Sequence, residues 1–317
     1  MKHTNLVNHK IAVAGASGFV GSYLTKFLRF YSNEVFELVR TVADKPISPE
    51  EIEIGDILKR NTYRGVFEGI DTVIYTIGRT HHTNEDDADF EVIYKEINCD
   101  AMIRMAKAAQ SQGIKRFIFL SSLKAIGDNT VEHTPFSKDS IPEPNGPYGR
   151  SKLIAERELL ELSSSTGLEV VIIRPPLIYG PGVKGNLRSI INAARLKIPL
   201  PLRWVSKNSR SMVSLENLCL LIKECIVNPE AANNTFFVKD QLDLSTVEIV
   251  RLLTKNEGLN PILFPFPESL MRLLFFMINK PWISERLFGD LTVDDAFTRE
   301  TLDWSPNKNQ DEMVNNK

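Results

Sequence analysis

The sequence contains little cysteine, and the few thiols are poorly placed for a disulfide framework or a metal site. The three cysteines, Cys99, Cys219 and Cys225, form no Cys-x-x-Cys pair, and an odd number of thiols cannot all be bridged. This usage suits a reducing compartment, so we expect a cytoplasmic protein. His81 and His82 are adjacent and not at ligand spacing, so we expect no metal ion.

The chain also lacks an excess of charge of either sign and a long apolar run. Lys and Arg number 38 against 40 for Asp and Glu, so no strong field favours nucleic acid or an anionic membrane as a partner. The longest apolar stretch, Leu270 to Ile278, contains Arg272 and is too short to span a bilayer. We interpret it as a core-facing or interface helix in preference to a membrane-surface one. A small molecule is the expected partner.

Short β-branched runs alternate with longer helical patterns in the first part of the chain. IAVAG precedes the stretch Val20 to Phe30, TVIYTI precedes Phe90 to Gln112, and RFIFLSS precedes Tyr148 to Thr166. This alternation predicts an α/β fold, a Rossmann-type doubly wound parallel sheet with helices on both faces. Ligands of such sheets bind at the carboxyl ends of the strands.

The alternation weakens after Tyr179, where the pattern becomes mixed. Helical patterns follow near Leu187 to Leu196, Leu215 to Val227 and Thr246 to Lys255. We therefore expect a first domain at residues 1–180 and a smaller, mainly substrate-binding lobe at 181–317, with some segments of the lobe returning to the first domain.

The segment Gly15-Ala-Ser-Gly18-Phe-Val-Gly21 follows an apolar strand and opens a helix, which is the context that a dinucleotide fingerprint requires. The glycines permit a tight turn and close approach of the backbone to a pyrophosphate, and the helix N-terminus favours the anion. The first domain is thus expected to bind one dinucleotide per chain. The contacts expected from this loop are Gly15, Ser17, Gly18, Phe19, Val20 and Gly21.

Further cofactor contacts are expected where the next strands end. Arg40 stands where an NAD-preferring protein usually carries an acid for the ribose 2′-hydroxyl, and a guanidinium suits a 2′-phosphate instead. This favours NADP slightly over NAD, the alternative being a solvated arginine. Asp56 and Ile57 follow the third strand, and Thr76 and Gly78 follow the fourth, so both pairs are candidates for lining the adenine and ribose.

Tyr148 and Lys152 are four residues apart at the start of an expected helix, so their side chains project from one face. A phenol with a pKa of about 10 is a poor base, but a neighbouring ammonium and a positive nicotinamide ring would lower that pKa. The alternative is an exposed helix face that carries a lysine. Ser122, at the end of the fifth strand, favours the chemical interpretation because its hydroxyl can hold a substrate oxygen for Tyr148.

The set GASGFVG, FLSS, YGRSK and RPPLIYGPG resembles the extended short-chain dehydrogenase/reductase family, in particular its NAD-dependent epimerase/dehydratase branch acting on nucleotide sugars. The resemblance implies that Ser122, Tyr148 and Lys152 form a catalytic triad and that Asn98 lies on the helix behind them. It also implies adenine contacts from Asp56 and Ile57. The substrate-binding residues that it implies are Arg79, Ser122, Asn186 and Arg210, of which Arg210 would grip the nucleotide diphosphate.

Departures from the family pattern discriminate among reactions. Sugar 4,6-dehydratases follow the catalytic hydroxyl with Asp and Glu, whereas this chain has Leu123 and Lys124, so dehydration is not expected. SSLKAIG and RPPLIYGPGVKGNL resemble most the bacterial UDP-glucose 4-epimerase group, which is linked to surface polysaccharides. That group includes epimerases and 4-keto-sugar reductases.

Three functional hypotheses follow from the resemblance. The first is a C4 epimerase of a UDP-hexose or UDP-N-acetylhexosamine, acting through a 4-keto intermediate with NAD or NADP tightly bound. The second is an NAD(P)H-dependent 4-keto-sugar reductase, and the third a catalytically inactive sensor or scaffold that binds cofactor. We expect a homodimer that pairs through the helices after the fourth and fifth strands, and neither a nucleic acid nor a membrane as partner.

Overall fold

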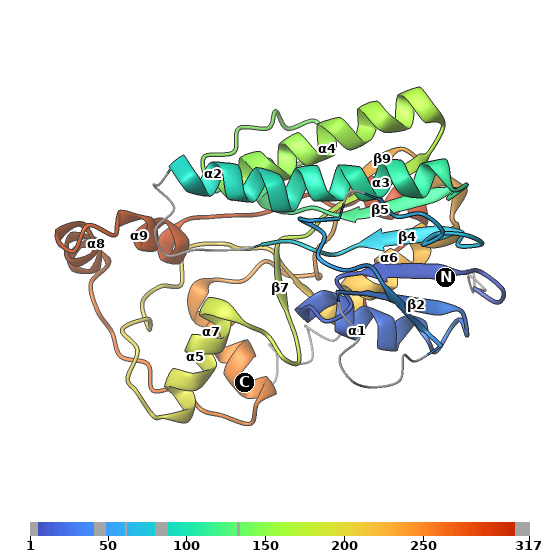
Figure 1. The fold of residues 1–317 in the computed structure, drawn as a ribbon. Coiled ribbons are helices and arrows are strands. Elements are labelled where there is room, and N and C mark those ends of the chain that lie inside the picture. Colours follow the sequence, from blue (N-terminus) through green and yellow to red (C-terminus); the bar gives the residue numbers. More distant parts are fainter. Residues whose placement is uncertain (1–5, 41–48, 61, 80–87, 132–133, 308–317) are drawn as a thin grey trace.

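Seven strands form one parallel sheet at the centre of the molecule (Figure 1). The computed structural model describes residues 6–40, 49–60, 62–79, 88–131 and 134–307. The strands are β1 (Ile11–Ala14), β2 (Val35–Val39), β3 (Glu51–Glu53), β4 (Thr72–Tyr75), β5 (Arg116–Leu120), β6 (Glu169–Arg174) and β9 (Asn234–Phe237). Their order across the sheet is β3-β2-β1-β4-β5-β6-β9, and each neighbouring pair is parallel.

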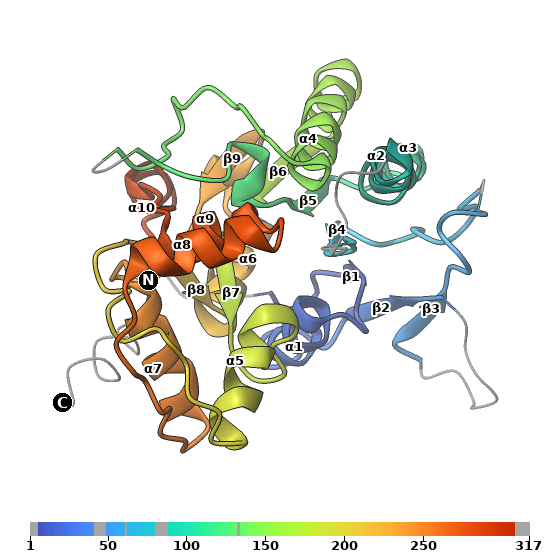
Figure 2. The ribbon, with the colours of Figure 1, turned by 90° about the vertical axis from the view of Figure 1, so that its left-hand side faces the viewer.

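Helices cover both faces of this sheet. One face carries α2 (Ala88–Lys95), α3 (Ala101–Ser111) and α4 (Pro147–Thr166), and the other carries α1 (Phe19–Leu28) and α6 (Leu215–Val227) (Figures 1 and 2). The arrangement confirms the Rossmann-type doubly wound sheet that the alternating sequence pattern predicts.

The side chains of β1 show why both faces must be covered. Ile11 and Val13 belong to the apolar cluster that includes residues of α1 and α6, whereas Ala12 and Ala14 belong to the cluster on the α3 and α4 face. All four are fully buried. Because successive side chains of a strand point to opposite faces, a strand that is apolar throughout requires helices on both sides.

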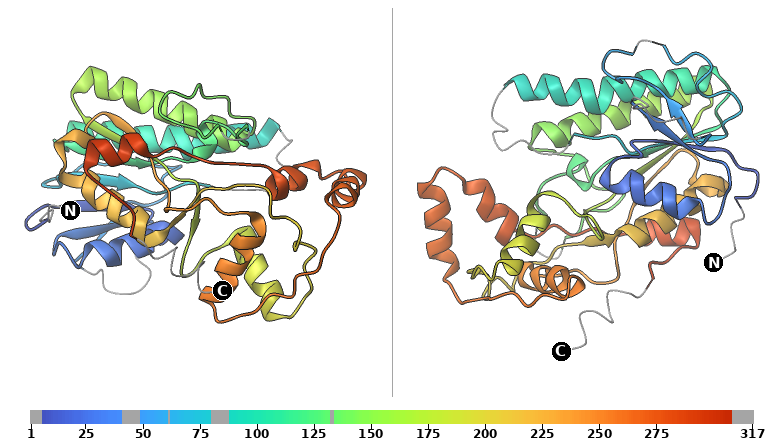
Figure 3. Two further views of the ribbon diagram at one scale, coloured as in Figure 1. Left: turned by 180° about the vertical axis from the view of Figure 1, so that it is seen from behind. Right: turned by 60° about the horizontal axis from the view of Figure 1, so that its bottom comes forward.

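The later part of the chain supplies a smaller lobe and also completes the sheet. The two-stranded sheet of β7 (Leu177–Tyr179) and β8 (Met212–Ser214) leads into the lobe, and α6 and β9 then return to the main sheet. Figure 3 shows the lobe on one side of the molecule. Its helices are α5 (Gly185–Arg195), α7 (Thr246–Asn256), α8 (Glu268–Met277) and α9 (Pro281–Phe288), and α10 (Ala296–Leu302) follows against β9.

The apolar stretch from Leu270 to Ile278, which we interpreted as a core-facing or interface helix, is mostly exposed in the structure. In α8 the only residue that is buried is Met271, while Leu273, Leu274 and Phe276 are at least half exposed. The helix contacts α9 and extends away from the rest of the lobe (Figures 1 and 3). Among the described residues, no helix is long and apolar enough to cross a membrane.

Candidate active site

The turn after β1 requires glycine at two positions. Gly15 has a φ of +89°, and a Cβ on this residue would lie 2.6 Å from Thr76 Oγ1. A Cβ on Gly21 would lie 2.1 Å from the carbonyl oxygen of Gly15, so α1 packs directly against the turn. Gly18 is the N-cap of α1 and offers no side-chain cap, which leaves the first N–H groups of the helix for an anion. The loop therefore fits the pyrophosphate of a dinucleotide.

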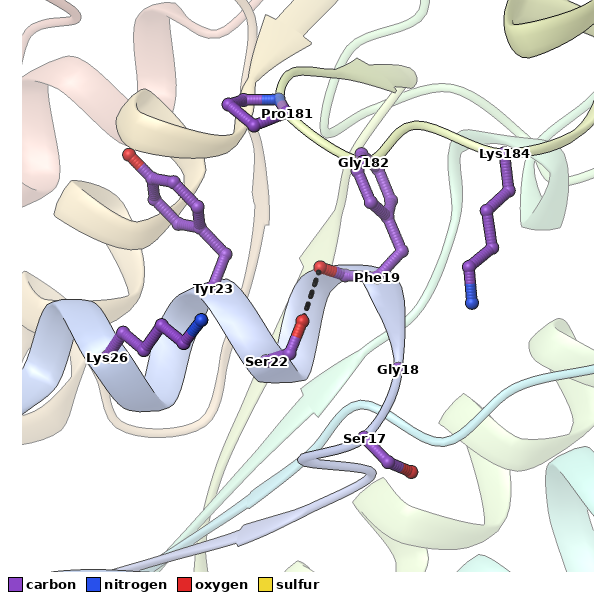
Figure 4. A pocket seen from close by; sticks show the side chains of 9 residues that line it. All are labelled: Ser17, Gly18, Phe19, Ser22, Tyr23, Lys26, Pro181, Gly182 and Lys184. Carbon is purple, nitrogen blue, oxygen red and sulfur yellow. Dashed lines mark hydrogen bonds between the residues drawn. The ribbon is translucent and has the colours of Figure 1, made fainter.

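A cavity of about 220 Å³ lies beside this helix N-terminus (Figure 4). Two ammonium groups, those of Lys26 and Lys184, belong to its lining, so the cavity suits an anionic group. Val20, in the first turn of α1, is partly buried and packs against the core. The sequence reasoning missed part of this lining. The lining residues are Ser17, Gly18, Phe19, Ser22, Tyr23, Lys26, Pro181, Gly182 and Lys184.

The end of β4 is fastened to its neighbours by polar side chains. Thr76 Oγ1 donates to the carbonyl of Ala14 at 2.8 Å and so supports the glycine turn. Asn98 is fully buried, and its Oδ1 accepts from the backbone N–H of Arg79 at 2.9 Å. Its Nδ2 donates to Ser151 Oγ at 3.0 Å. Asn98 thus ties the loop after β4 to the first turns of α4, behind the expected triad.

Asn98 occupies a π-turn in an otherwise α-helical segment. The turn η1 (Glu96–Asp100) separates α2 from α3, where the sequence pattern indicated one continuous helix over 90–112. A π-turn holds one residue more than an α-turn of the same rise, and such turns occur frequently at functional sites. The extra residue lets the Asn98 carboxamide leave the helix and reach the loop.

Tyr148 and Ser122 meet at the end of β5. The Ser122 hydroxyl lies close enough to the Tyr148 hydroxyl to act on its pKa, and the ring of Tyr94 packs edge-on against Tyr148 with 6.0 Å between centroids. The backbone N–H of Lys124 donates to Ser122 Oγ at 3.2 Å, so the short 3₁₀ turn η2 (Leu123–Ala125) fixes that hydroxyl. The structure therefore brings together the phenol and the hydroxyl that the sequence singled out.

Lys152 is 2% exposed and points to the same region. Its Nζ donates to the carbonyl of Leu120 at 3.0 Å and lies 4.5 Å from the centroid of the Phe119 ring. Nζ would also lie 3.3 Å from a Cβ on Gly78, which places the ammonium beneath the loop after β4. The ends of β4 and β5 and the start of α4 thus converge on one volume.

The pKa values of this pair are set by burial. Desolvation raises the pKa of Tyr148 to about 12, although the nearby Ser122 hydroxyl acts in the opposite direction. Desolvation lowers the pKa of Lys152 to about 8, and the nearby carboxylate of Glu156 opposes that shift. In the protein without a cofactor, burial therefore determines the direction of the Tyr148 pKa shift. The lowering that we expect from Lys152 together with a nicotinamide ring stays a prediction for the cofactor-bound enzyme.

A buried carboxylate lies one turn beyond Lys152 on α4. Glu156 is 2% exposed, accepts a hydrogen bond from Ser121 Oγ and forms a 2.5 Å ion pair with Arg174 of β6. The guanidinium makes two of its nitrogen contacts with this carboxylate. Glu156 thus connects the serine next to Ser122 with the end of β6, and the sequence analysis gave it no role.

The other expected contacts lie farther along the same edge of the sheet or in the lobe. Arg40 is exposed after β2, and the backbone carbonyl of Ile57 accepts from Arg104 at 3.1 Å. Asp56 Oδ1 accepts from the N–H of Leu58 at 3.0 Å. Asn186 is exposed on α5. His81 and His82 lie outside the described residues.

Arg210 is held in the lobe by the segment after α9. Its Nη1 donates to the carbonyl of Gly289 at 3.0 Å. Burial lowers the pKa of Arg210 to about 10, and the positive charge of Arg286 acts in the same direction while Asp290 opposes it. Two guanidinium groups therefore lie near each other, and the sequence analysis named only Arg210.

Comparison with known proteins identifies the family. The model of the NAD dependent epimerase/dehydratase family matches residues 11–232. A Vibrio cholerae protein named UDP-glucose 4-epimerase is 36% identical over 299 residues, which are 93% of this chain and 90% of the relative. An N-acetyl-alpha-D-glucosaminyl-diphospho-ditrans,octacis-undecaprenol 4-epimerase of Escherichia coli O157:H7 is 26% identical, over 84% of this chain and 78% of the relative.

A solved structure shows the same fold. The structure of MoeE5 in complex with UDP-glucuronic acid and NAD superposes with a TM-score of 0.75 at 21% identity and covers 96% of each chain. The matched family model spans the glycine turn, the Ser122 strand end and α4, which are the elements that build the site described above. The chain therefore is an enzyme of the extended short-chain dehydrogenase/reductase type and belongs to the NAD dependent epimerase/dehydratase family.

Proposed function

We propose that this enzyme is a C4 epimerase of a UDP-hexose or a UDP-N-acetylhexosamine. The observation that carries the proposal is that Tyr148, Ser122 and Lys152 come together at the end of β5. Leu123 and Lys124 directly follow Ser122 in the chain. Those two residues supply no carboxylate for the loss of water, so reversible oxidation at C4 fits the site better than dehydration. The name of the Vibrio cholerae relative supports this substrate class.

In the proposed mechanism Ser122 Oγ holds the 4-hydroxyl of the sugar against the Tyr148 hydroxyl. Tyr148 takes the hydroxyl proton as C4 is oxidised and returns it when C4 is reduced. A bound nicotinamide supplies the chemistry of hydride acceptance and return. Because the pKa of Tyr148 is about 12 in the protein alone, the protonated form of Lys152 is needed nearby to favour the phenolate.

We further propose that the diphosphate of the substrate binds to the lobe. Arg210 and the neighbouring Arg286 provide two positive charges, and the loss of solvent around Arg210 strengthens a contact with an anion. Anchoring the nucleotide end leaves the sugar free to turn as a 4-keto intermediate, which is what inversion at C4 requires. Both faces of C4 can then be presented in turn to the same side of the site.

The second candidate function is a 4-keto-sugar reductase that uses NADPH. The exposed Arg40 at the end of β2 favours it, because a guanidinium there can pair with a 2′-phosphate. The residues that move the proton would be the same. Only the source of the hydride and the direction of the reaction would differ.

One pair of assays separates the two functions. With a UDP-hexose or UDP-N-acetylhexosamine, the epimerase forms the C4 epimer without net change in absorbance of the reduced nicotinamide. Sustained, stoichiometric consumption of NADPH on a UDP-4-keto-6-deoxy sugar would overturn the epimerase in favour of the reductase. Tyr148→Phe is the control for either outcome, and we expect it to lose at least about a hundredfold in kcat. If the protein binds the cofactor but shows no turnover in either assay, both proposed functions are contradicted.

A further inference from the structure

The lobe carries a protruding arm that is apolar and exposed. The arm consists of residues 268–288, which form α8, α9 and their connection. Phe276 and Met277 are 73% and 72% exposed, and Ile278 is 57% exposed. Together with the half-exposed Leu273 and Leu274 they form a run of large apolar residues in and just after α8. This helix lies at one end of the molecule (Figures 1 and 3). Contiguous exposed apolar side chains of this kind mark a docking surface.

Two tryptophans of the lobe are exposed. Of the three tryptophans in the chain, Trp304 is 3% exposed and belongs to the core beneath the sheet. Trp282 of α9 is 38% exposed, with the Arg286 guanidinium 4.6 Å from the centroid of its ring. Trp204 is 59% exposed, and its sequence neighbours Leu202 and Val205 are buried in one cluster with Met271 of α8. An indole with an apolar body and one polar N–H is favoured at the boundary between lipid headgroups and acyl chains.

A cationic cavity of about 380 Å³ lies at the base of the arm. Arg203, Arg251 and Asn260 supply its polar groups. Its apolar lining residue Leu263 belongs to the same hydrophobic cluster as Met271 of α8, which ties the cavity to the arm. Two guanidinium groups and an amide around such a volume fit a phosphate.

Positive charge prevails over this part of the surface, although the whole chain is nearly neutral. Four cations of the arm and cavity stand against two carboxylates, and one of those carboxylates, that of Glu268, is paired with Arg272 at 2.7 Å. Arg286 is left out of this count because it lies near Arg210 of the proposed diphosphate site. The cations are Arg203, Arg251, Arg272 and Lys280, and the carboxylates are Glu268 and Glu285.

We propose that the arm and the cavity dock this enzyme on an anionic phospholipid bilayer. The apolar side chains of α8 enter the boundary between headgroups and acyl chains, and the cavity binds a lipid phosphate. Exposed indoles beside an excess of cations favour this occupant over a second copy of the chain, whose identical surface would bring like charges together. This proposal differs from the expectation that no membrane is a partner, and it does not depend on which sugar reaction the active site performs.

Docking through the arm would also orient the active site. The segment after α9 begins with Gly289, whose carbonyl accepts from Arg210, so the expected diphosphate site lies directly behind the arm. A nucleotide sugar or its product would then enter and leave close to the bilayer surface.

Vesicle binding by the full chain tests the proposal. We expect cosedimentation with vesicles of phosphatidylcholine and phosphatidylglycerol in about a two-to-one ratio, no more than weak binding to phosphatidylcholine alone, and loss of binding at high salt. The fluorescence of the exposed tryptophans should shift to shorter wavelength on binding. Phe276→Glu should weaken partitioning by at least about tenfold, and Arg251→Glu should weaken it on anionic vesicles only.

Matched controls make each outcome decisive. Phe30→Glu replaces an apolar side chain that is 86% exposed on the opposite part of the chain, so it should leave vesicle binding unchanged. Turnover of the soluble sugar should be the same in all three variants. Failure of the wild type to bind anionic vesicles would overturn the proposal. So would a dimer that Phe276→Glu dissociates, because the arm would then be an interface between copies of the chain.

Discussion

Burial of Lys152 should cost the protein stability, and removing its charge should recover that stability while abolishing turnover. The side chain is 2% exposed, and burial lowers its pKa from 10.5 to about 8. The difference of about 2.5 pKa units corresponds to about 3 kcal/mol at neutral pH. Lys152→Met keeps the length of the side chain but loses the hydrogen bond to Leu120, which costs about 1 kcal/mol. We therefore expect the variant to be more stable by about 2 kcal/mol.

The pH dependence gives this prediction a signature. Below about pH 8 both the folded and the unfolded wild type carry the proton on Lys152, so the full cost applies. Between about pH 8 and pH 10.5 the folded state loses that proton while the unfolded state keeps it, so the stability of the wild type rises with pH relative to the variant. The advantage of Lys152→Met should have largely disappeared by about pH 10.

Urea unfolding at a series of pH values measures both quantities. Other groups that titrate in this range are common to the two proteins and cancel in the difference between their free energies of unfolding. Lys107→Met, at an exposed position of α3, is the matched control and should not alter the free energy of unfolding. If Lys152→Met is less stable than the wild type at pH 7, or if its advantage does not change with pH, burial of the ammonium is not the dominant effect.

Two further predictions concern the surroundings of the triad. Gly21→Ala would place a Cβ 2.1 Å from the backbone oxygen of Gly15. We therefore expect cofactor affinity, measured by calorimetric titration, to fall at least about tenfold, and the free energy of unfolding, measured by thermal unfolding, to fall by roughly 1–3 kcal/mol. Unchanged cofactor affinity would refute the close approach of α1 to the turn. Glu156→Gln removes the negative charge that raises the pKa of Lys152, so the alkaline limb of kcat/KM should move to lower pH by roughly half a unit or more. An unmoved limb would leave Glu156 with a structural role only.

Local patterns predicted the elements well where one periodicity extends over a whole element. The expected helix over 215–227 has the same bounds as α6, because an apolar stripe and the N-cap Ser214 mark it clearly. The glycine turn was also predictable, since its spacing and its strand-helix context are both local. By contrast, a helical period cannot reveal the one surplus residue in η1, so the break between α2 and α3 was not foreseen.

Features that depend on distant parts of the chain were not predictable. The cavity beside α1 joins Lys26 to Lys184, and nothing local relates the two residues. The spacing of Tyr148 and Lys152 indicated their shared helix face correctly. It did not show that the ammonium donates to the carbonyl of Leu120, or that burial raises the pKa of Tyr148 in the protein without a cofactor. Hydrophobicity likewise marked α8 as a contact surface without showing that the rest of this chain leaves it exposed.

The π-turn at Asn98 constrains the number of residues in the helical segment that contains it. One surplus residue rotates everything before it by about 100° relative to everything after it. Tyr94 lies before the turn and packs against Tyr148, while Asn98 lies within the turn and holds Arg79 and Ser151. The number of residues from 94 to 98 is therefore fixed by two contacts at once. The helices on either side can lengthen or shorten at their far ends, but a deletion inside this interval would move the contact of Tyr94 with Tyr148 out of phase with the hydrogen bonds of Asn98.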